Sequence, residues 1–236
     1  MKSIIMSVLM TIAFINLSGQ TFEKDKFNTS KGDLEITFIG HGSLMMTYNK
    51  MVIYIDPTNM FADYSEMPKA DLVLVTHEHG DHLDSKAIEQ VWKENTALVL
   101  TSTCAKKLGK GEIMSNGDTR TIAGITITAV PAYNLTKAFH PRGTGNGYVI
   151  QFGDKKVYVA GDTENIPEMA DLKNIDIAFL PMNLPYTMTP AMVAEAAKVF
   201  RPKILYPYHF GDTKTEELVN LLKDEKGIEV RIRKLN

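Results

Sequence analysis

The sequence predicts an α+β fold in which two β-sheets pack face to face and carry helices on their outer faces. Two observations predict it. Both halves of the chain contain strand-like segments followed by mixed strands and helices, as a two-sheet sandwich with outer helices requires. The 236 residues, 44% of them hydrophobic, are enough to bury one substantial core. We therefore expect one sandwich domain over residues 34–236.

The first twenty residues differ in kind from the rest. Lys2 precedes a largely apolar stretch that ends at Ile15, and small residues follow it. This pattern is typical of a secretory signal peptide, and the apolar stretch is short for a membrane span. We expect a signal peptide over residues 1–20, a periplasmic or secreted bacterial protein, and no stable membrane span after signal removal. An uncleaved membrane anchor is the alternative.

The first half of the domain is expected to follow a polar linker at residues 21–33 and to open with strands at 34–39, 43–48 and 51–55. Asn49 and Lys50 suit a two-residue hairpin turn. The next expected elements are a buried strand at 72–75, a helix at 85–92, a strand at 97–101 and a hairpin of 119–122 with 125–130.

The second half repeats this order. We expect a hairpin of residues 147–152 with 156–160, a strand at 177–180, a helix at 190–199, a strand at 204–208 and a helix at 215–222. Thr189 and Pro190 form a typical helix start. The basic run from Arg231 to Lys234 is interpreted as a solvated strand edge.

Half of the histidines lie in one short run. The chain has six, and His77, His79 and His82 fall within six positions together with Asp81. Neutral imidazole and carboxylate are the main nitrogen and oxygen ligands of zinc and related ions. The run therefore predicts a metal site. A solvated polar loop before a helix is the alternative.

The spacing of this run indicates which side chains share a face. Alternate side chains of an extended segment point the same way, so His77, His79 and Asp81 could share one face while His82 turns toward a neighbouring position. Two adjacent metals suit this arrangement better than one. The four-residue spacing of a helical zinc site is absent.

The pattern His77-x-His79-x-Asp81-His82 resembles the signature of the metallo-β-lactamase superfamily, hydrolases with a centre of one or two metal ions. Residues 54–57, 160–163 and 206–209 resemble further family elements in the same order. The resemblance covers about residues 34–233. It implies a four-layer αββα sandwich with the metal centre at one edge.

The resemblance also implies how the ligands divide. His77, His79 and His140 would hold the first metal, Asp81, His82 and His209 the second, and Asp162 would bridge them. Two divalent ions are expected, with Zn²⁺ as the first choice and Mn²⁺ or Fe²⁺ as alternatives. A metal-bound hydroxide, formed because the metals lower the pKa of a shared water, would attack an ester, lactone, amide or phosphodiester.

His140 is the one departure from the family pattern. The family usually has this histidine directly after a middle strand, whereas residues 131–134 of this chain contain none. His140 is the only remaining candidate between the first motif and Asp162, and a loop can carry it back to the site. The alternative is that His140 is an ordinary loop residue and Tyr133 lines the site.

His41 and Asp56 are assigned supporting roles. His41 lies in a Gly-His-Gly-Ser element that resembles one in family branches acting on phosphodiesters, lactones and amides. Outside the ligand set it could orient substrate or shuttle a proton, so His41 is assigned to catalysis together with the ligand Asp81. A structural histidine at the strand turn is the alternative. Asp56 is interpreted as the acceptor for a ligand imidazole, and Asp84 as a helix cap.

Tyr133 and Tyr186 are predicted to line a substrate pocket, with packing of the Tyr186 loop against the next helix as the alternative. A net charge of −2 gives no broad basic field, so nucleic acid is not expected as a partner. A small-molecule or lipid-like substrate is expected. Within the superfamily, the Gly-His-Gly-Ser and Pro-Tyr-His elements resemble the branch related to ascorbate-phosphate lactonases and N-acyl-phosphatidylethanolamine phospholipases.

Two other functions fit the same residues. Iron in this scaffold could handle oxygen or sulfur species, because histidine and carboxylate bind iron well. The second alternative function is that of a protein that binds metal or a ligand without catalysing a reaction. Cys104 is the only thiol, so no intrachain disulfide can form. The sequence leaves the oligomeric state open.

Overall fold

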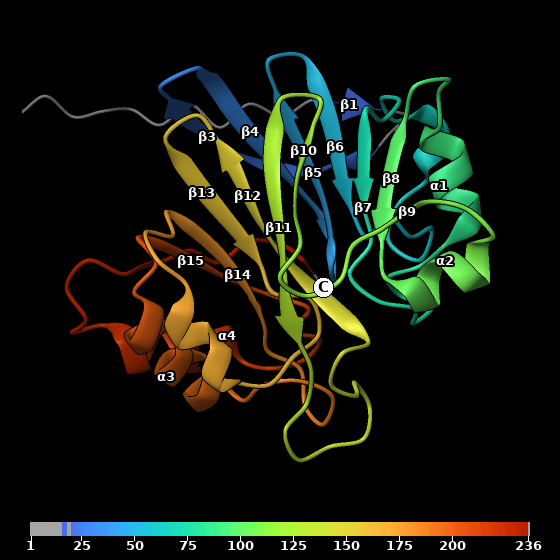
Figure 1. Cartoon of the computed structure of the whole chain (residues 1–236). Helices are drawn as coiled ribbons and strands as arrows, with labels where there is room; N and C mark the ends of the chain where they lie inside the picture. The colour runs from blue at the N-terminus through green and yellow to red at the C-terminus, as the bar shows by residue number, and fades with distance from the viewer. Residues whose placement is uncertain (1–15, 18–19, 236) are drawn as a thin grey trace, which may run out of the picture.

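The computed structural model of the protein describes residues 16–17 and 20–235. Two seven-stranded sheets pack face to face with helices on both outer faces, so the predicted four-layer αββα sandwich is confirmed (Figure 1). Most of the predicted signal peptide lies outside the described residues. Within the described ranges, no helix is long and apolar enough to cross a membrane.

The strands of the first sheet follow each other in chain order. They are β3 (Glu23–Thr29), β4 (Gly32–Gly40), β5 (Ser43–Tyr48), β6 (Met51–Ile55), β7 (Leu72–Leu74), β8 (Ala97–Leu100) and β9 (Glu112–Ile113). Pairing is antiparallel from β3 to β6 and parallel from β6 to β9. Helices α1 (Ser85–Val91) and α2 (Ser102–Leu108) lie on the outer side of this sheet (Figure 1).

The second sheet repeats the same scheme. Its strands are β10 (Thr119–Ile122), β11 (Ile125–Ala132), β12 (Gly145–Phe152), β13 (Lys155–Val159), β14 (Ile177–Pro181), β15 (Ile204–Tyr208) and β16 (Glu229–Val230). Pairing is antiparallel from β10 to β13 and parallel from β13 to β16. Helices α3 (Pro190–Phe200) and α4 (Thr215–Leu222) cover it. Short pieces complete the structure: β1 (Asn16–Leu17), β2 (Gln20–Thr21), and 3-10 turns at Tyr64–Glu66 and Pro167–Asp171.

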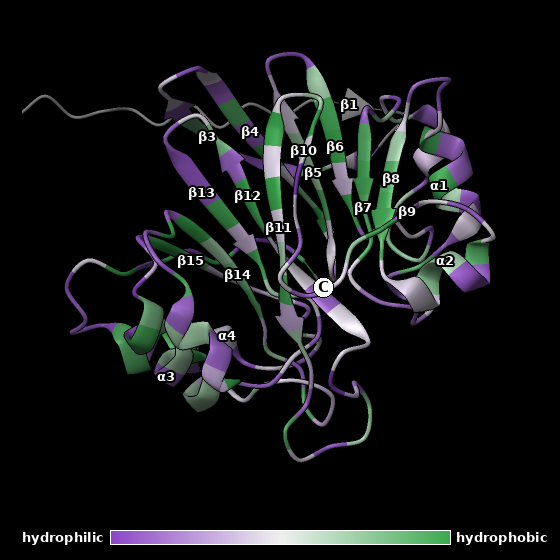
Figure 2. Cartoon of the chain, in the orientation of Figure 1, coloured by the Kyte–Doolittle hydropathy of each residue, from purple (hydrophilic) through white to green (hydrophobic). Residues whose placement is uncertain are grey.

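The core lies between the sheets. Phe38 of β4 packs against Phe179 of β14 and Tyr206 of β15, with ring centroids 6.2 Å and 5.1 Å away. The central parallel strands β7 and β14 are buried at every position, and Figure 2 shows β7 and most of β14 in hydrophobic colours. Burial on both faces is expected for parallel strands that are covered by a sheet on one side and helices on the other.

The predicted linker at residues 21–33 is wrong. Residues 23–29 form strand β3, which pairs along its whole length with β4. The strand is polar because it lies at the sheet edge, where Lys24 pairs with Glu35 and Lys26 with Asp33 across the two strands. Cross-strand charge pairs therefore support a strand that the hydrophobic pattern does not reveal.

The interpretation of the basic C-terminal run as a solvated edge is also wrong. Arg233 makes a bidentate ion pair with Asp25, whose carboxylate is buried, and Arg231 lies 3.5 Å from the same carboxylate. The Tyr206 hydroxyl also donates a hydrogen bond to Asp25. These contacts tie β3 of the first sheet to β15 of the second and to the C-terminal tail.

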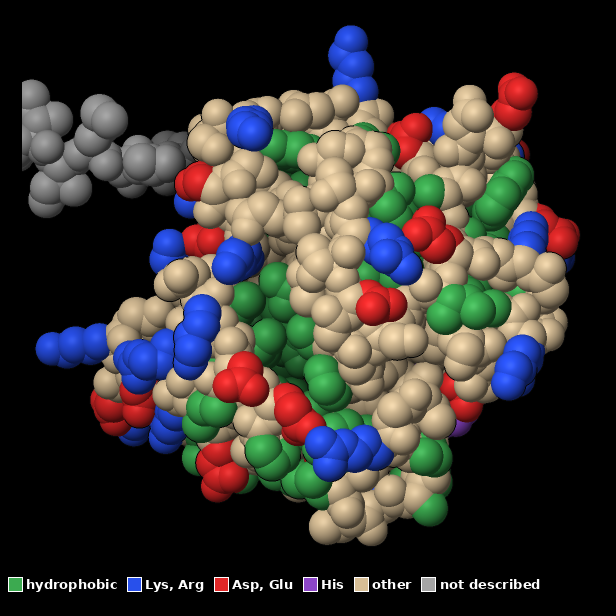
Figure 3. All heavy atoms as spheres, viewed as in Figure 1, with side chains coloured by type: hydrophobic (Ala, Val, Ile, Leu, Met, Phe, Trp, Pro, Cys, Tyr) green, Lys and Arg blue, Asp and Glu red, His purple; other side chains and the backbone are tan. Residues whose placement is uncertain are grey.

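Charges are mixed on the molecular surface. On the face shown in Figure 3, Lys and Arg side chains are interspersed with Asp and Glu side chains rather than gathered in one patch. This distribution matches the formal net charge of −2.

Candidate metal centre

All six histidines of the chain gather at one edge of the sandwich, together with Asp81 and Asp162. They lie on loops that follow strands of both sheets. Residues 75–84 follow β7, residues 133–144 follow β11, and Asp162 follows β13. His41 and His209 follow β4 and β15. Because the two sheets have the same scheme of pairing, their strand ends meet and each contributes ligands.

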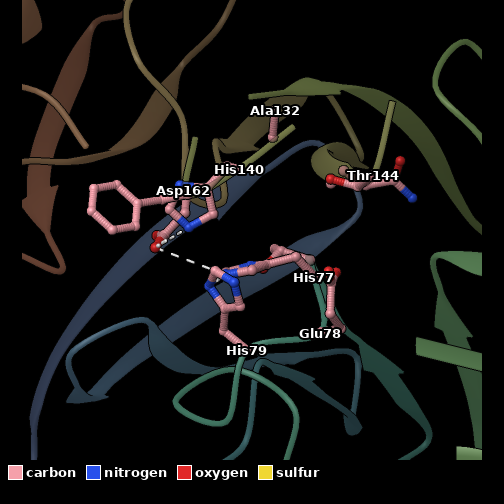
Figure 4. A pocket seen from close by; sticks show the side chains of 11 residues that line it. His77, Glu78, His79, Ala132, His140, Thr144 and Asp162 are labelled. Atoms are coloured by element: carbon pink, nitrogen blue, oxygen red, sulfur yellow. Dashed lines mark hydrogen bonds and ion pairs between the residues drawn. The ribbon is translucent and has the colours of Figure 1, made fainter. Parts of the chain in front are cut away.

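The first group consists of His77, His79 and His140, whose ligand atoms lie within 4.8 Å of one another. His77 Nε2 is 3.2 Å from His79 Nδ1. His140 comes from the long loop after β11 and points at Asp162, as Figure 4 shows. The loop thus carries His140 to the place that the family pattern requires.

The second group contains Asp81, His82 and His209. Asp81 Oδ2 lies 3.7 Å from His82 Nε2 and 3.5 Å from His209 Nε2. His41, which the sequence left outside the ligand set, belongs to this group by position. Its Nε2 atom is 3.1 Å from Asp81 Oδ2.

Asp162 lies between the two groups. Its Oδ2 atom is 3.3 Å from His140 Nε2 on one side and 3.3 Å from His209 Nε2 on the other. Its Oδ1 atom is 3.6 Å from His82 Nε2. One carboxylate therefore faces ligands of both groups, which is the position that a bridging ligand occupies.

Several buried polar atoms in the site have no hydrogen-bond partner among the described residues: His82 Nε2, His140 Nε2, His209 Nε2 and Asp162 Oδ1. An unpaired buried polar atom costs about 1–3 kcal/mol, so four in one place need an explanation. All four are of the nitrogen and oxygen types that bind divalent metals. The residues therefore fit the metal ions that the family pattern implies.

The opposite ring nitrogens of His77 and His82 are held by hydrogen bonds, whereas His209 Nδ1 has no partner among the described residues. His82 Nδ1 donates to Asp56 Oδ2 at 2.8 Å, and His77 Nδ1 lies 3.0 Å from the Thr76 hydroxyl, which itself donates to Asp56. The Thr76 amide also donates to Asp56. Asp56, fully buried, thus orients one histidine of each group and leaves both Nε2 atoms facing the site.

Asn134 holds His140 in the same way. Its Oδ1 atom accepts hydrogen bonds from the His140 amide at 3.0 Å and from His140 Nδ1 at 2.6 Å. Its side-chain amide donates to the Tyr186 carbonyl on the neighbouring loop. Sequence reasoning gave no role to Asn134 or Thr76. Thr76 directly precedes His77, and this adjacency was the one available signal for it.

Neutral imidazoles and an ionised carboxylate favour the binding of cations at the site. Burial lowers the pKa of His77 well below its usual value and lowers that of His79, so both rings are neutral. Burial opposes ionisation of Asp162, but His209 and the other imidazoles hold its pKa well below the usual range. Burial also disfavours charge on His82, yet Asp162 and Asp56 raise its pKa to about 9.

The backbone at the site is locally strained. His41, Asp56 and His209 have φ values of 53°, 44° and 47°, in the left-handed region that side chains other than glycine seldom adopt. Such conformations cost roughly 1–3 kcal/mol each and concentrate at functional sites. His41 and His209 of the second group, and Asp56, are therefore held in place at a cost to stability.

A cavity of about 340 Å³ opens onto the cluster. Tyr186 lines it, together with Asn183 and Phe139, whose ring packs edge-on against Tyr186 at 5.0 Å. The prediction for Tyr133 is wrong, because its hydroxyl donates to Glu168 and its ring packs under Arg142, outside the cavity lining. The strand β11 continues through Pro131 to Ala132, and this extension turns Tyr133 away from the site.

A family model described as the β-lactamase superfamily domain matches residues 35–209. The chain belongs to the metallo-β-lactamase superfamily. UPF0173 metal-dependent hydrolases from Pelotomaculum thermopropionicum and Thermus thermophilus are 31% and 33% identical to it over 200 and 189 residues. Each match covers 75% of this chain and 84% of the relative.

Solved structures agree with this superfamily. A crystal structure from Parabacteroides distasonis, named as a candidate metal-dependent hydrolase, is 56% identical with a TM-score of 0.89, covering 91% of this chain and 100% of that one. Igni18, a metallo hydrolase from Ignicoccus hospitalis, is 24% identical with a TM-score of 0.73, covering 86% of this chain and 96% of that one, and shows the shared fold. This member of the metallo-β-lactamase superfamily is thus a metallo-hydrolase.

Proposed function

We propose that the protein is a hydrolase with two metal ions that uses metal-activated water to cleave an ester, lactone, amide or phosphodiester. The observation that carries the proposal is the convergence of unpaired buried atoms from His82, His140, His209 and Asp162 between two ligand groups. Divalent ions held there supply a water whose pKa is lowered toward neutrality. Zn²⁺ is the proposed ion of the first site, where three histidines and one carboxylate match its usual ligands.

The residues of this chain position the reaction. His77, His79, His140 and Asp162 would hold the first ion, and Asp81, His82, His209 and Asp162 the second. Asp56 and Asn134 fix the ring orientations of His77, His82 and His140. The cavity beside them admits a small molecule or the end of a larger one, with its scissile bond next to Asp81 and Asp162.

The rim of this cavity favours a substrate with an apolar group. Phe139 and Tyr186 line the cavity and are 43% and 44% exposed, and Leu135 and Leu184 on the same loops are 52% and 50% exposed, although all four are large hydrophobic side chains. They lie on the two loops that Asn134 joins. Lys137, the cation on the same loop, is paired with Glu164 and donates to the Thr187 carbonyl. An amphiphilic or lipid-like substrate fits this rim. Such a substrate is also compatible with the family branches that act on lactones and phosphodiesters.

The test combines metal analysis with turnover. Protein purified without added metal is analysed for metal content and assayed on panels of phosphodiesters, lactones, amides and β-lactams. We expect two metal equivalents and turnover of at least one panel, abolished by Asp162→Asn and unchanged in the exposed control Thr121→Ala. Iron with oxygen consumption, or stably bound metal with no turnover in any metal form, would contradict the proposal.

We further propose that the protein is exported to a bacterial periplasm by residues 1–20. The support is the basic start and short apolar stretch of that segment. The mass of the mature N-terminus, measured on protein recovered from a periplasmic extract, checks this. An intact Met1 in cytoplasmic protein would contradict export.

A further inference from the structure

His41 lies in direct contact with the second ligand group. Its Nε2 atom is 3.1 Å from Asp81 Oδ2, and its ring centroid is 3.6 Å from that of His209. The ligand atoms of His41, Asp81, His82 and His209 all lie within 4.8 Å of one another. His41 thus shares the space into which the second group points.

The separations between donors match those of one coordination shell. Two donors that bind the same ion at about 2.1 Å lie about 3.0–3.4 Å apart. The distance from His41 Nε2 to Asp81 Oδ2 falls in this range and is shorter than the 3.5 Å and 3.7 Å from that oxygen to His209 and His82. It also resembles the 3.2 Å between His77 and His79 in the first group.

The backbone of His41 is fixed as firmly as that of the other ligands. Its amide donates to the Leu235 carbonyl at 2.7 Å, and its carbonyl accepts from the His209 amide at 3.0 Å. The first contact anchors His41 to the buried C-terminal tail, and the second ties it directly to another ligand.

The ring plane of His41 is also fixed. Phe61 stacks on it with centroids 4.9 Å apart and an angle of 14°. Gly40 permits this approach, because a Cβ at Gly40 would lie 2.8 Å from Phe61 Cβ. Among the described residues, Asp81 is the one hydrogen-bond partner of the His41 side chain. The ring is therefore held with its Nε2 atom toward the second group.

We propose that His41 is a ligand of the second metal ion. With Asp81, His82, His209 and Asp162, that ion then has five protein donors, whereas the first ion has four. Four donors of this kind suit tetrahedral zinc, while five leave room for a water in a six-coordinate shell, which Mn²⁺ and Fe²⁺ favour over zinc. The two sites accordingly differ in metal preference, and the second site is the one selective for Mn²⁺ or Fe²⁺. This inference rests on the proposed metal centre but not on any substrate.

The competing explanation is that His41 donates a hydrogen bond to Asp81 from outside the coordination shell. Both explanations weaken the second metal when His41 is lost, so affinity alone does not separate them. Direct detection of a nitrogen bound to the ion separates the two explanations.

The experiment uses His41→Gly with added imidazole. Glycine adopts the φ of 53° without strain, so the variant keeps the backbone and leaves a ring-sized space. Mn²⁺ binding to wild type and variant is followed by titration, and pulsed EPR is recorded with ¹⁵N-imidazole. We expect the second Mn²⁺ to bind at least about tenfold more weakly in the variant. Imidazole should restore its affinity and produce a ¹⁵N coupling of a directly bound nitrogen.

Two controls complete the design. Wild type treated with ¹⁵N-imidazole is the reference for imidazole that binds at the open water position, and the coupling counted for His41→Gly is the additional one that wild type lacks. Lys50→Gly places a glycine at another left-handed position, in the exposed turn between β5 and β6, and should retain both ions. Unchanged binding of the second ion in His41→Gly, or restored binding without a ¹⁵N coupling, would overturn the assignment. A protein that passes this test yet hydrolyses no substrate would contradict the hydrolase proposal and leave the His41 assignment intact.

Discussion

At the scale of single residues, Asp56 is the carboxylate that orients ligands of both groups. It accepts from His82 Nδ1 and, through the Thr76 hydroxyl, supports His77. In Asp56→Asn the amide cannot accept all of these hydrogen bonds, so both rings lose their fixed orientation. We expect metal affinity to fall about 10–100-fold, measured by competition with a chelator. Asp84→Asn is the matched control, because asparagine also caps α1 and should leave metal affinity unchanged.

Cys104 gives a pH dependence that is separate from the metal centre. Burial raises the pKa of its thiol to about 11, so the reactive thiolate is scarce at neutral pH. Alkylation by iodoacetamide in the native protein should be slow at pH 8 and should accelerate as the pH rises toward 11. A rate that levels off near pH 8.5, the usual range of a free thiol, would show that the helix α2 does not bury this side chain.

At the scale of elements, the loop after β11 is expected to hold the first metal. Asn134 joins this loop to the Tyr186 loop and fixes His140. Asn134→Ala should therefore lower occupancy of the first ion while the second remains, as measured by metal analysis after dialysis. Thr136→Ala is the control. Thr136 lies in the same loop as Asn134, but its hydroxyl donates to Glu164, so this variant should retain both ions. Equal loss of both ions in Asn134→Ala would contradict this division of the site.

The strand β3 is expected to depend on one buried charge. Asp25→Asn leaves Arg233 without its ionised partner, and breaking such a buried pair costs about 3–5 kcal/mol. Urea unfolding should show this loss of stability. Asp33→Asn, which changes an exposed pair of the same two strands, should cost less than about 1 kcal/mol. Equal stabilities of the two variants would mean that β3 contributes little to the fold.

At the scale of the whole molecule, the parts predicted from the sequence are those that local patterns determine. The apolar runs of β7 and β14, the hairpin at Asn49 and Lys50, and the cap at Asp84 depend on neighbouring residues, and the structure has them where expected. The short-range motif from His77 to His82 likewise sufficed to indicate a metal centre, and the superfamily match supports it.

The parts that the sequence did not reveal depend on distant partners. The burial of Asp25 is explained by Arg233 and Tyr206, which lie 208 and 181 positions away along the chain. The Tyr133 hydroxyl donates to Glu168, 35 positions further on, and Asn134 joins its loop to Tyr186, 52 positions further on. His41 could be placed near the site but not against Asp81, since the two meet only when the first sheet is formed.

We propose that two metal ions lie among the two ligand groups and that Asp162 bridges these ions. Anomalous diffraction from crystals of the metal-loaded protein tests it most directly. We expect two anomalous peaks, one among His77, His79 and His140 and one among Asp81, His82 and His209, with Asp162 contacting both and His41 contacting the second. A single peak, or a pair of peaks that Asp162 does not bridge, would contradict the account.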